Sequence, residues 1–114
     1  YQNKFTNNNI ALRIKTSESN QIYNNTFQKN SQGIVICCNA KYNIIYANNF
    51  INNDIHAHDP IGNQWHYQNT GNYWDDYMSY DDDQDGRGDI PYPIPALDGK
   101  SIVSDNYPLL SRNS

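Results

Sequence analysis

The sequence predicts an all-β fold: a parallel β-helix of three to four rungs of about 22 residues each, followed by an irregular C-terminal cap. Three observations lead to this prediction. The pattern Asn-x-Phe recurs at Asn3, Asn25 and Asn48, which are 22 and 23 residues apart. Within each repeat, short runs alternate polar and apolar residues with a period of two, as strands do. No run shows the periodicity of an amphipathic helix.

The repeats predict columns of apolar side chains that stack from rung to rung inside the β-helix. Strands in successive rungs lie about 4.8 Å apart, so residues at equivalent positions should contact one another. Such in-register columns are not expected of low-complexity sequence, which is the alternative for so asparagine-rich a chain. The predicted columns are Phe5, Phe27 and Phe50; Leu12, Ile34 and Ile55; and Ile22 and Ile45.

Asparagine is concentrated in the repeats: the chain has 19, and 14 of these fall in residues 1–53. We interpret them as corner residues, because asparagine tolerates left-handed backbone better than most residues do. An amide that recurs in every rung can donate a hydrogen bond to one neighbouring rung and accept one from the other. The sequence therefore predicts hydrogen-bonded asparagine ladders along the corners.

The regular repeat changes after residue 58. Trp65 takes the place of an isoleucine in the pattern and Trp74 that of a phenylalanine, so these large indoles are expected to close the apolar column. The prolines that follow oppose further strands. We predict β-helix rungs in residues 1–58 and a last partial rung with the cap in residues 59–114, as one structural unit. The prolines are Pro91, Pro93, Pro95 and Pro108.

The N-terminal end is predicted to be open. Tyr1 falls inside a rung, which would leave unpaired strand edges and an apolar cross-section exposed. Upstream rungs or a second copy of the chain would cover this surface. We therefore expect further rungs or a homo-oligomer, for which a twofold dimer is the simplest arrangement.

Charge is distributed unevenly along the chain. Up to residue 58, five Lys and Arg face two acidic residues, a balance of +3, whereas from residue 59 three Lys and Arg face ten Asp, a balance of −7. The acidic half argues against a nucleic-acid partner, which needs a basic face, and favours cations. No apolar run is long enough to span a membrane, so no membrane insertion is expected.

The repeat and the tail together resemble a known family. Rungs of the form NxFxxN…GIxI…NxI are followed by GNYWDDYMSYDDDQDGRGDIPYPI and then DNYPLL. This combination resembles the NosD-like right-handed parallel β-helix proteins, the carbohydrate-binding and sugar-hydrolase (CASH) repeat group, and the tail is its specific part. The resemblance implies a right-handed β-helix and an extracellular, cell-surface or periplasmic location. It leaves function open, because members include copper-centre maturation factors, polysaccharide-active enzymes and structural surface proteins.

The function we expect is that of a non-catalytic extracellular or cell-envelope module with a structural or assembly role, stabilised by calcium. Sugar cleavage on this fold needs two carboxylates on one face. The only acids of the β-helix body, Glu18 and Asp54, fall at different repeat positions. A carbohydrate-binding module, or the C-terminal part of a polysaccharide-active enzyme, is the main alternative, and a copper-handling module is a weaker one.

An acidic loop supplies the candidate calcium site. Residues 81–89 have the spacing of an EF-hand-like loop, in which alternate carboxylates converge on a hard cation and Gly86 permits a sharp bend. Tyr92 departs from the pattern, because it stands where an EF-hand has a bidentate Glu. The missing ligand would have to come from water or from Asp75, Asp76, Asp98 or Asp105. An empty, solvated loop is the alternative. The predicted ligands are Asp81, Asp83, Asp85 and Asp89, with Arg87 contributing its backbone carbonyl.

A second, weaker metal site is predicted at His56 and His58. If Ile55 and Ala57 point inward, both imidazoles lie on one outward face, because side chains alternate along a strand. The repeat alignment places Cys37 in the rung beneath His58, where it would add a soft ligand. Two ordinary surface histidines are the alternative.

The outward faces carry three further candidate features. Tyr23 and Tyr46 stack at one repeat position and could contact a glycan, although an aromatic ladder that only supports the sheet is the alternative. A glycosylation sequon begins at Asn24. The adjacent Cys37 and Cys38 are interpreted as one outward and one inward residue of the rung, with a vicinal or intermolecular disulfide as the alternative.

Overall fold

The computed structural model describes residues 1–77, 90–94 and 103–110, which contain strands and turns but no helix. The strands are short because the chain turns a corner after each of them. In chain order they are β1 (Lys4–Thr6), β2 (Ile10–Lys15), β3 (Gln21–Tyr23), β4 (Thr26–Gln28), β5 (Gln32–Cys37), β6 (Ile44–Tyr46), β7 (Asn49–Ile51), β8 (Ile55–His58), β9 (Tyr73–Trp74), β10 (Tyr92–Ile94) and β11 (Val103–Asp105).

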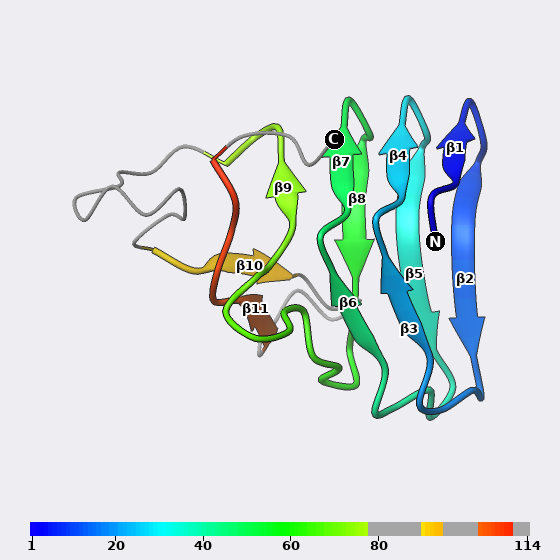
Figure 1. The fold of residues 1–114 in the computed structure, drawn as a ribbon. Helices are drawn as coiled ribbons and strands as arrows, with labels where there is room; N and C mark the ends of the chain where they lie inside the picture. The colour runs from blue at the N-terminus through cyan, green and yellow to red at the C-terminus, as the bar shows by residue number, and fades with distance from the viewer. Residues whose placement is uncertain (78–89, 95–102, 111–114) are drawn as a thin grey trace.

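Parallel pairing joins each rung to the next (Figure 1). One sheet has the order β1-β4-β7-β9, a second β2-β5-β8, and a third β3-β6. Each of these strands pairs with the strand at the same position one rung further along, so the three sheets wrap around a common core. The prediction of a parallel β-helix is confirmed. Beyond the last rung, β10 and β11 pair antiparallel in the cap.

An aromatic column runs through the core. Phe5, Phe27 and Phe50 lie in register, with ring centroids 5.0 and 5.1 Å apart, as predicted. The column continues through Trp74, 4.3 Å from Phe50, and ends on Tyr92 of β10, 4.2 Å from Trp74. The cap therefore adds a ring to the stack that the rungs begin. The Ile22–Ile45 column is also confirmed.

The third predicted column was wrong at its last position. Leu12 pairs with Ile34, but Ile34 pairs with Ala57 and not with Ile55. Ile55 lies opposite Gln32 and is 44% exposed. The reason is that the 23-residue offset between the second and third rungs continues into β8, whereas the apolar character of Ile55 suggested an offset two residues shorter.

Three asparagine ladders run along the corners, as predicted. At each step, the backbone N–H and the side-chain amide of one asparagine both donate to Oδ1 of the asparagine one rung further on, at 2.9 to 3.3 Å. All the amides of a ladder therefore point the same way. The ladders are Asn3-Asn25-Asn48-Asn72, Asn8-Asn30-Asn53 and Asn20-Asn43-Asn63.

Left-handed backbone occurs at the residue that precedes a ladder asparagine. Lys29, with a φ of 58°, precedes Asn30, and Ala47, with a φ of 56°, precedes Asn48. A left-handed residue other than glycine costs roughly 1–2 kcal/mol. The paired hydrogen bonds of the ladder offset this cost, which explains why lysine and alanine are accepted at these corners.

The C-terminal end of the core is closed by two indoles. Trp65 and Trp74 are 0% and 1% exposed. Asn63 and Asn72 carry two ladders past residue 58, so rung-like contacts extend into the region predicted as a partial rung. The boundary between residues 58 and 59 stays a prediction. Across the described ranges, no helix has the length and apolar character needed to cross a membrane.

Candidate metal site

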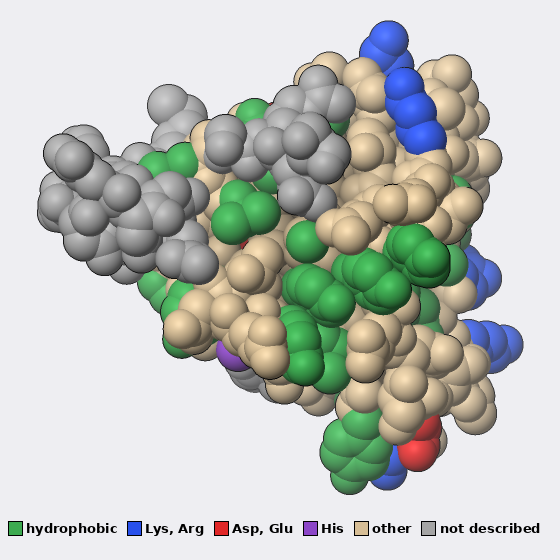
Figure 2. All heavy atoms as spheres, viewed as in Figure 1, with side chains coloured by type: hydrophobic (Ala, Val, Ile, Leu, Met, Phe, Trp, Pro, Cys, Tyr) green, Lys and Arg blue, Asp and Glu red, His purple; other side chains and the backbone are tan. Residues whose placement is uncertain are grey.

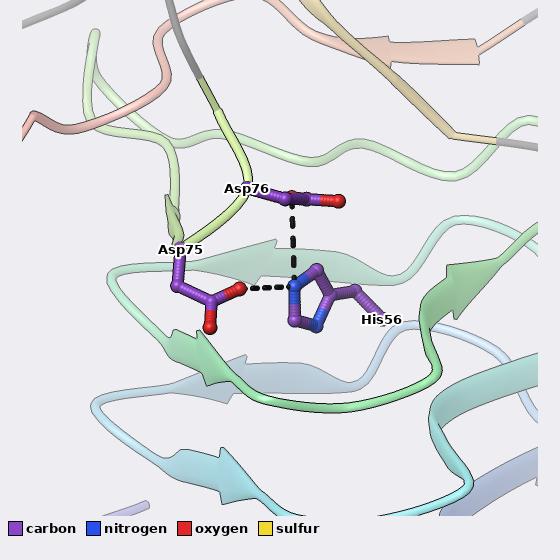
Figure 3. A group of neighbouring side chains, drawn as sticks. All are labelled: His56, Asp75 and Asp76. Atoms are coloured by element: carbon purple, nitrogen blue, oxygen red, sulfur yellow. Dashed lines mark hydrogen bonds and ion pairs between the residues drawn. The ribbon is translucent and has the colours of Figure 1, made fainter.

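The described residues hold one cluster of potential metal ligands, at the end of the β-helix (Figure 3). One ligand atom from each of His56, Asp75 and Asp76 lies within 4.8 Å of the others. His56 belongs to β8, and the two aspartates follow β9 directly. Nε2 of His56 is 2.7 Å from Oδ1 of Asp75 and 3.5 Å from Oδ1 of Asp76, as the dashed lines in Figure 3 mark.

His56 reaches this place because its backbone lies against a glycine. A Cβ added at Gly33 would lie 2.3 Å from the carbonyl oxygen of His56, so any larger residue in β5 would push β8 away. The imidazole is buried against the rings of Phe50 and Trp74, at centroid distances of 5.9 and 6.0 Å. His56 therefore lies at the edge of the aromatic column, and the prediction that it shares an outward face with His58 does not describe its surroundings.

The asparagine ladder determines which nitrogen of His56 carries the proton. Oδ1 of Asn53 accepts from Asn30, and Nδ2 of Asn53 donates to the carbonyl of Phe27 at 2.8 Å, so the amide orientation is fixed. The same Nδ2 lies 3.0 Å from Nδ1 of His56, which must then act as the acceptor. In the neutral ring the proton is on Nε2, where it is donated to Asp75.

Each ladder ends on a carboxylate. The backbone N–H of Asn72 donates to Asp105 at 2.7 Å, and that of Asn63 donates to Asp59 at 2.7 Å. The third ladder reaches Asp75 through the imidazole of His56. At each ladder step the backbone N–H and one amide N–H point toward this end of the β-helix, while the second amide N–H, as in Asn48, donates to a carbonyl of the preceding rung. A carboxylate at this end therefore accepts the forward-pointing donors that no further asparagine accepts.

The two buried terminal aspartates also hold the indoles. Trp74 donates from Nε1 to Asp105 at 2.9 Å, and Trp65 does the same to Asp59 at 2.9 Å. Burial raises the pKa of the Asp105 carboxyl, and the donors from Trp74, Asn72 and Tyr107 act in the opposite direction. These contacts make the carboxylates part of the closure of the fold.

The hydrogen-bonded cluster does not fit a copper ion. An imidazole nitrogen with two carboxylates is a donor set that Cu(II) accepts. A metal on Nε2 of neutral His56, however, requires the proton to be on Nδ1, where it would point at the N–H of Asn53. The ladder thus presents an N–H rather than a lone pair to Asp75 and Asp76.

None of the other predicted metal residues belongs to this cluster as the described residues define it. Asp81, Asp83, Asp85, Arg87 and Asp89 fall outside the described residues. His58 lies in register with Val35 and is 8% exposed, and its Nε2 has no hydrogen-bond partner among the described residues. Because His58 pairs with Val35 and not with Cys37, the predicted alignment of Cys37 with His58 was wrong. The pair His56 and His58 stays a prediction as a metal site.

The predicted glycan ladder is longer than two tyrosines. Tyr1, Tyr23, Tyr46 and Tyr67 stack in sequence at centroid distances of 5.1 to 5.2 Å. Tyr23 lies nearly parallel to its neighbours, so their ring faces contact one another and a sugar would meet mainly ring edges and hydroxyls. Burial, followed by the neighbouring phenols, raises the pKa of Tyr46. Glycan contact stays a prediction, as does glycosylation at Asn24, an exposed left-handed turn residue.

Sequence reasoning missed the role of Asp75 and Asp76 beside His56. It considered both aspartates only as extra calcium ligands. A signal was present, because Asp75 directly follows Trp74, the residue that continues the phenylalanine column. His56 and Asp75 are 19 residues apart in the sequence, and their contact could be predicted only from the register of β8 and β9.

These rungs, ladders and capping contacts define a parallel β-helix repeat protein. The chain belongs to the family described as "Periplasmic copper-binding protein (NosD)", whose model matches residues 1–79. It is similar to proteins named "Probable ABC transporter binding protein NosD" from Stutzerimonas stutzeri, at 38% identity over 84 residues, and from Pseudomonas aeruginosa, at 36% over 84 residues.

Both alignments cover 72% of this chain but 19% and 20% of the relatives, so the chain spans about a fifth of their length. No solved structure matches the chain. The family description confirms the predicted location in the cell envelope, specifically a periplasmic setting.

The calcium prediction was wrong. The family to which the chain belongs is described as copper-binding, not calcium-binding. Tyr92, which lies just after the predicted loop, has a different role in the structure. Tyr92, at the position of the last EF-hand ligand, lies in β10, stacks on Trp74 and donates its hydroxyl proton to Asp76 at 3.0 Å. It serves the aromatic column and the cap.

Proposed function

We propose that this chain is a non-catalytic β-helix segment of a periplasmic copper-handling protein, and that its ladder ends serve the scaffold rather than hold copper. The family description supports the copper role. The observation that carries the scaffold role is the termination of all three asparagine ladders on Asp59, Asp75 and Asp105. These carboxylates are occupied by hydrogen bonds that stabilise the fold.

The positions of the two acids in the β-helix body argue against sugar cleavage by that body. Retaining and inverting glycosidases need two carboxyl groups about 5–9.5 Å apart on one face. In the β-helix body, Glu18 lies at a bridge to Lys41, in the connection after β2, whereas Asp54 precedes β8. The two acids lie at different corners of the β-helix, so they cannot act as a pair of carboxyl groups in acid–base chemistry.

Protein docking is the activity we propose for the segment within this setting. Two relatives carry names that describe them as probable ABC transporter binding proteins. A rigid stack of short strands presents flat outward faces, and repeat proteins use such extended surfaces to bind other proteins. We therefore propose a protein partner for one outward face.

Copper titration tests the proposal. Copper binding to the wild type is measured for Cu(II) and, anaerobically, for Cu(I), by competition with a chromophoric chelator. We expect copper to bind, and His56→Ala to keep the Cu(II) affinity within about twofold, which corresponds to less than about 0.5 kcal/mol. Absence of copper binding in either oxidation state would refute the copper role. A loss of more than about tenfold in both His56→Ala and Asp75→Asn would instead identify these side chains as ligands.

A further inference from the structure

The two cysteines of the chain form a disulfide between neighbours. Cys37 is the last residue of β5, and Cys38 begins the turn that follows. Cys38 and Asn39 have φ values of 61° and 64°, and the backbone N–H of Ala40 donates to the carbonyl of Cys37 at 3.1 Å. Cys38 is exposed and Cys37 half-buried, so a reactive partner can reach the bond.

This disulfide adds little to the stability of the fold. A disulfide stabilises chiefly by closing a loop of the unfolded chain, and the gain grows with loop length. Here the sequence separation is one residue, so almost no chain entropy is removed. Strand β5, which ends at Cys37, is already held by its pairing with β2 on one side and with β8 on the other. A role other than stabilisation is therefore indicated.

The surroundings of the pair favour thiolate chemistry. Cys37 lies opposite Lys15 of β2, and Arg13 lies two residues away on the same strand, with both basic side chains exposed. Figure 2 shows Lys and Arg side chains gathered along the side of the molecule where β2 runs. Positive neighbours stabilise a thiolate relative to a thiol. No acidic residue lies opposite Cys37 in the β2–β5 pairing.

We propose that Cys37 and Cys38 form a redox-gated site for Cu(I), closed as the disulfide and open as the dithiol. The inference rests on the proposed copper role and names ligands for it. Soft thiolate ligands select Cu(I) over harder ions. The two sulfurs already lie side by side in the disulfide, so both can face one ion after the bond opens. In the oxidising periplasm the disulfide is the resting form.

Opening requires a dithiol reductant, such as a protein of the thiol–disulfide oxidoreductase class. One thiolate of the reductant attacks the exposed Sγ of Cys38, and Cys37 leaves as a thiolate. The second thiolate of the reductant then attacks the reductant sulfur that is bonded to Cys38 in the mixed disulfide, and Cys38 leaves as a thiolate. Two electrons pass to the cysteines, and the reductant becomes a disulfide. Binding of one Cu(I), delivered already reduced, displaces any protons left on the two sulfurs.

Anaerobic Cu(I) titration tests this site in three forms of the protein. These are the oxidised wild type, the wild type reduced with dithiothreitol and freed of reductant, and a Cys37→Ser/Cys38→Ser variant. The wild type reduced and then alkylated with iodoacetamide is the matched control. We expect the reduced wild type to bind one more Cu(I) per chain than the other forms, with a thiolate-to-copper ultraviolet band. The melting temperature of the double variant should stay within about 2 °C of wild type.

The outcomes separate this inference from the proposed function. Equal Cu(I) binding by all forms would overturn the cysteine site and leave the copper role intact. Resistance of the disulfide to dithiothreitol in the folded protein would also overturn it. If no form binds copper in either oxidation state, the copper role itself fails.

Discussion

Asn53, the last asparagine of its ladder, is hydrogen-bonded to the imidazole of His56. The 3.0 Å contact from Nδ2 to Nδ1 fixes the proton on the opposite nitrogen, from which it is donated to Asp75. His56, which its carboxylate neighbours alone would suggest as a metal ligand, is therefore part of the hydrogen-bonded framework of the fold.

Asp75→Asn should destabilise the protein, whereas Asp76→Asn should not. Asp75 accepts the backbone N–H of Asn52 at 2.6 Å and the Nε2–H of His56 at 2.7 Å. Breaking the partner of a largely buried donor costs about 1–3 kcal/mol. Asp76 is 61% exposed, so its change should cost less than about 0.5 kcal/mol. Urea unfolding of both variants provides the comparison, and equal losses would contradict the assignment.

Asn48→Ala should cost far more than Asn9→Ala. Asn48 is fully buried and its amide joins Asn25, Asn72 and the carbonyl of Ile22. Its loss leaves several buried groups without partners, at about 1–3 kcal/mol each. Asn9 is exposed and belongs to none of the ladders, which makes it the control. Thermal unfolding of the two variants decides, and similar midpoints would show that the ladders contribute little.

Gly33→Ala should disrupt the pairing of β5 with β8. The new Cβ would lie 2.3 Å from the carbonyl oxygen of His56, a distance that backbone atoms cannot accept. We expect a loss of more than about 2 kcal/mol, because the strand must shift. Chemical denaturation gives the magnitude. Ile55→Ala, an exposed change in the facing strand, is the control and should stay within about 0.5 kcal/mol.

Replacing Asp105 by Asn should change how stability depends on pH. Burial raises the pKa of Asp105 in the folded protein. The folded state therefore binds this proton more tightly than the unfolded chain, whose Asp pKa is about 3.9. The contribution of Asp105 is greatest below that value and is lost as the pH rises through the folded pKa. Unfolding free energies of wild type and Asp105→Asn from pH 4 to 7 should diverge in favour of wild type toward pH 4. Parallel curves would contradict the shift.

The fold could be predicted from the sequence where identical residues repeat at a constant interval. Phe5, Phe27 and Phe50 specify the register of one sheet by themselves. At β8 the residue type misled, because Ile55 is more apolar than Ala57 yet lies outside. Side-chain identity and position disagree there, and only the hydrogen-bonded register decides between them.

The site could be predicted less well than the fold. His56 contacts Asn53, three residues before it, and Asp75 and Asp76, 19 and 20 residues after it. The first lies in the connection before β8 and the other two in the segment that follows β9. None of these distances follows from the repeat, since β9 is reached only after the pattern has changed. The acidic spacing of residues 81–89 resembled a calcium loop, but spacing alone does not report which ion a family uses.

The common direction of the asparagine amides has a consequence for how such chains change length during evolution. A duplicated unit of 22 or 23 residues, inserted before Asn48, would supply each ladder with one more amide of the correct orientation. The closing residues around Trp65 and Trp74 would need no change. Successive ladder asparagines are 20 to 24 residues apart, so the connections of a rung can differ in length by a few residues while the ladders are kept. The β-helix can therefore be lengthened by whole rungs, while the segment around Trp65 and Trp74 that closes it stays unchanged.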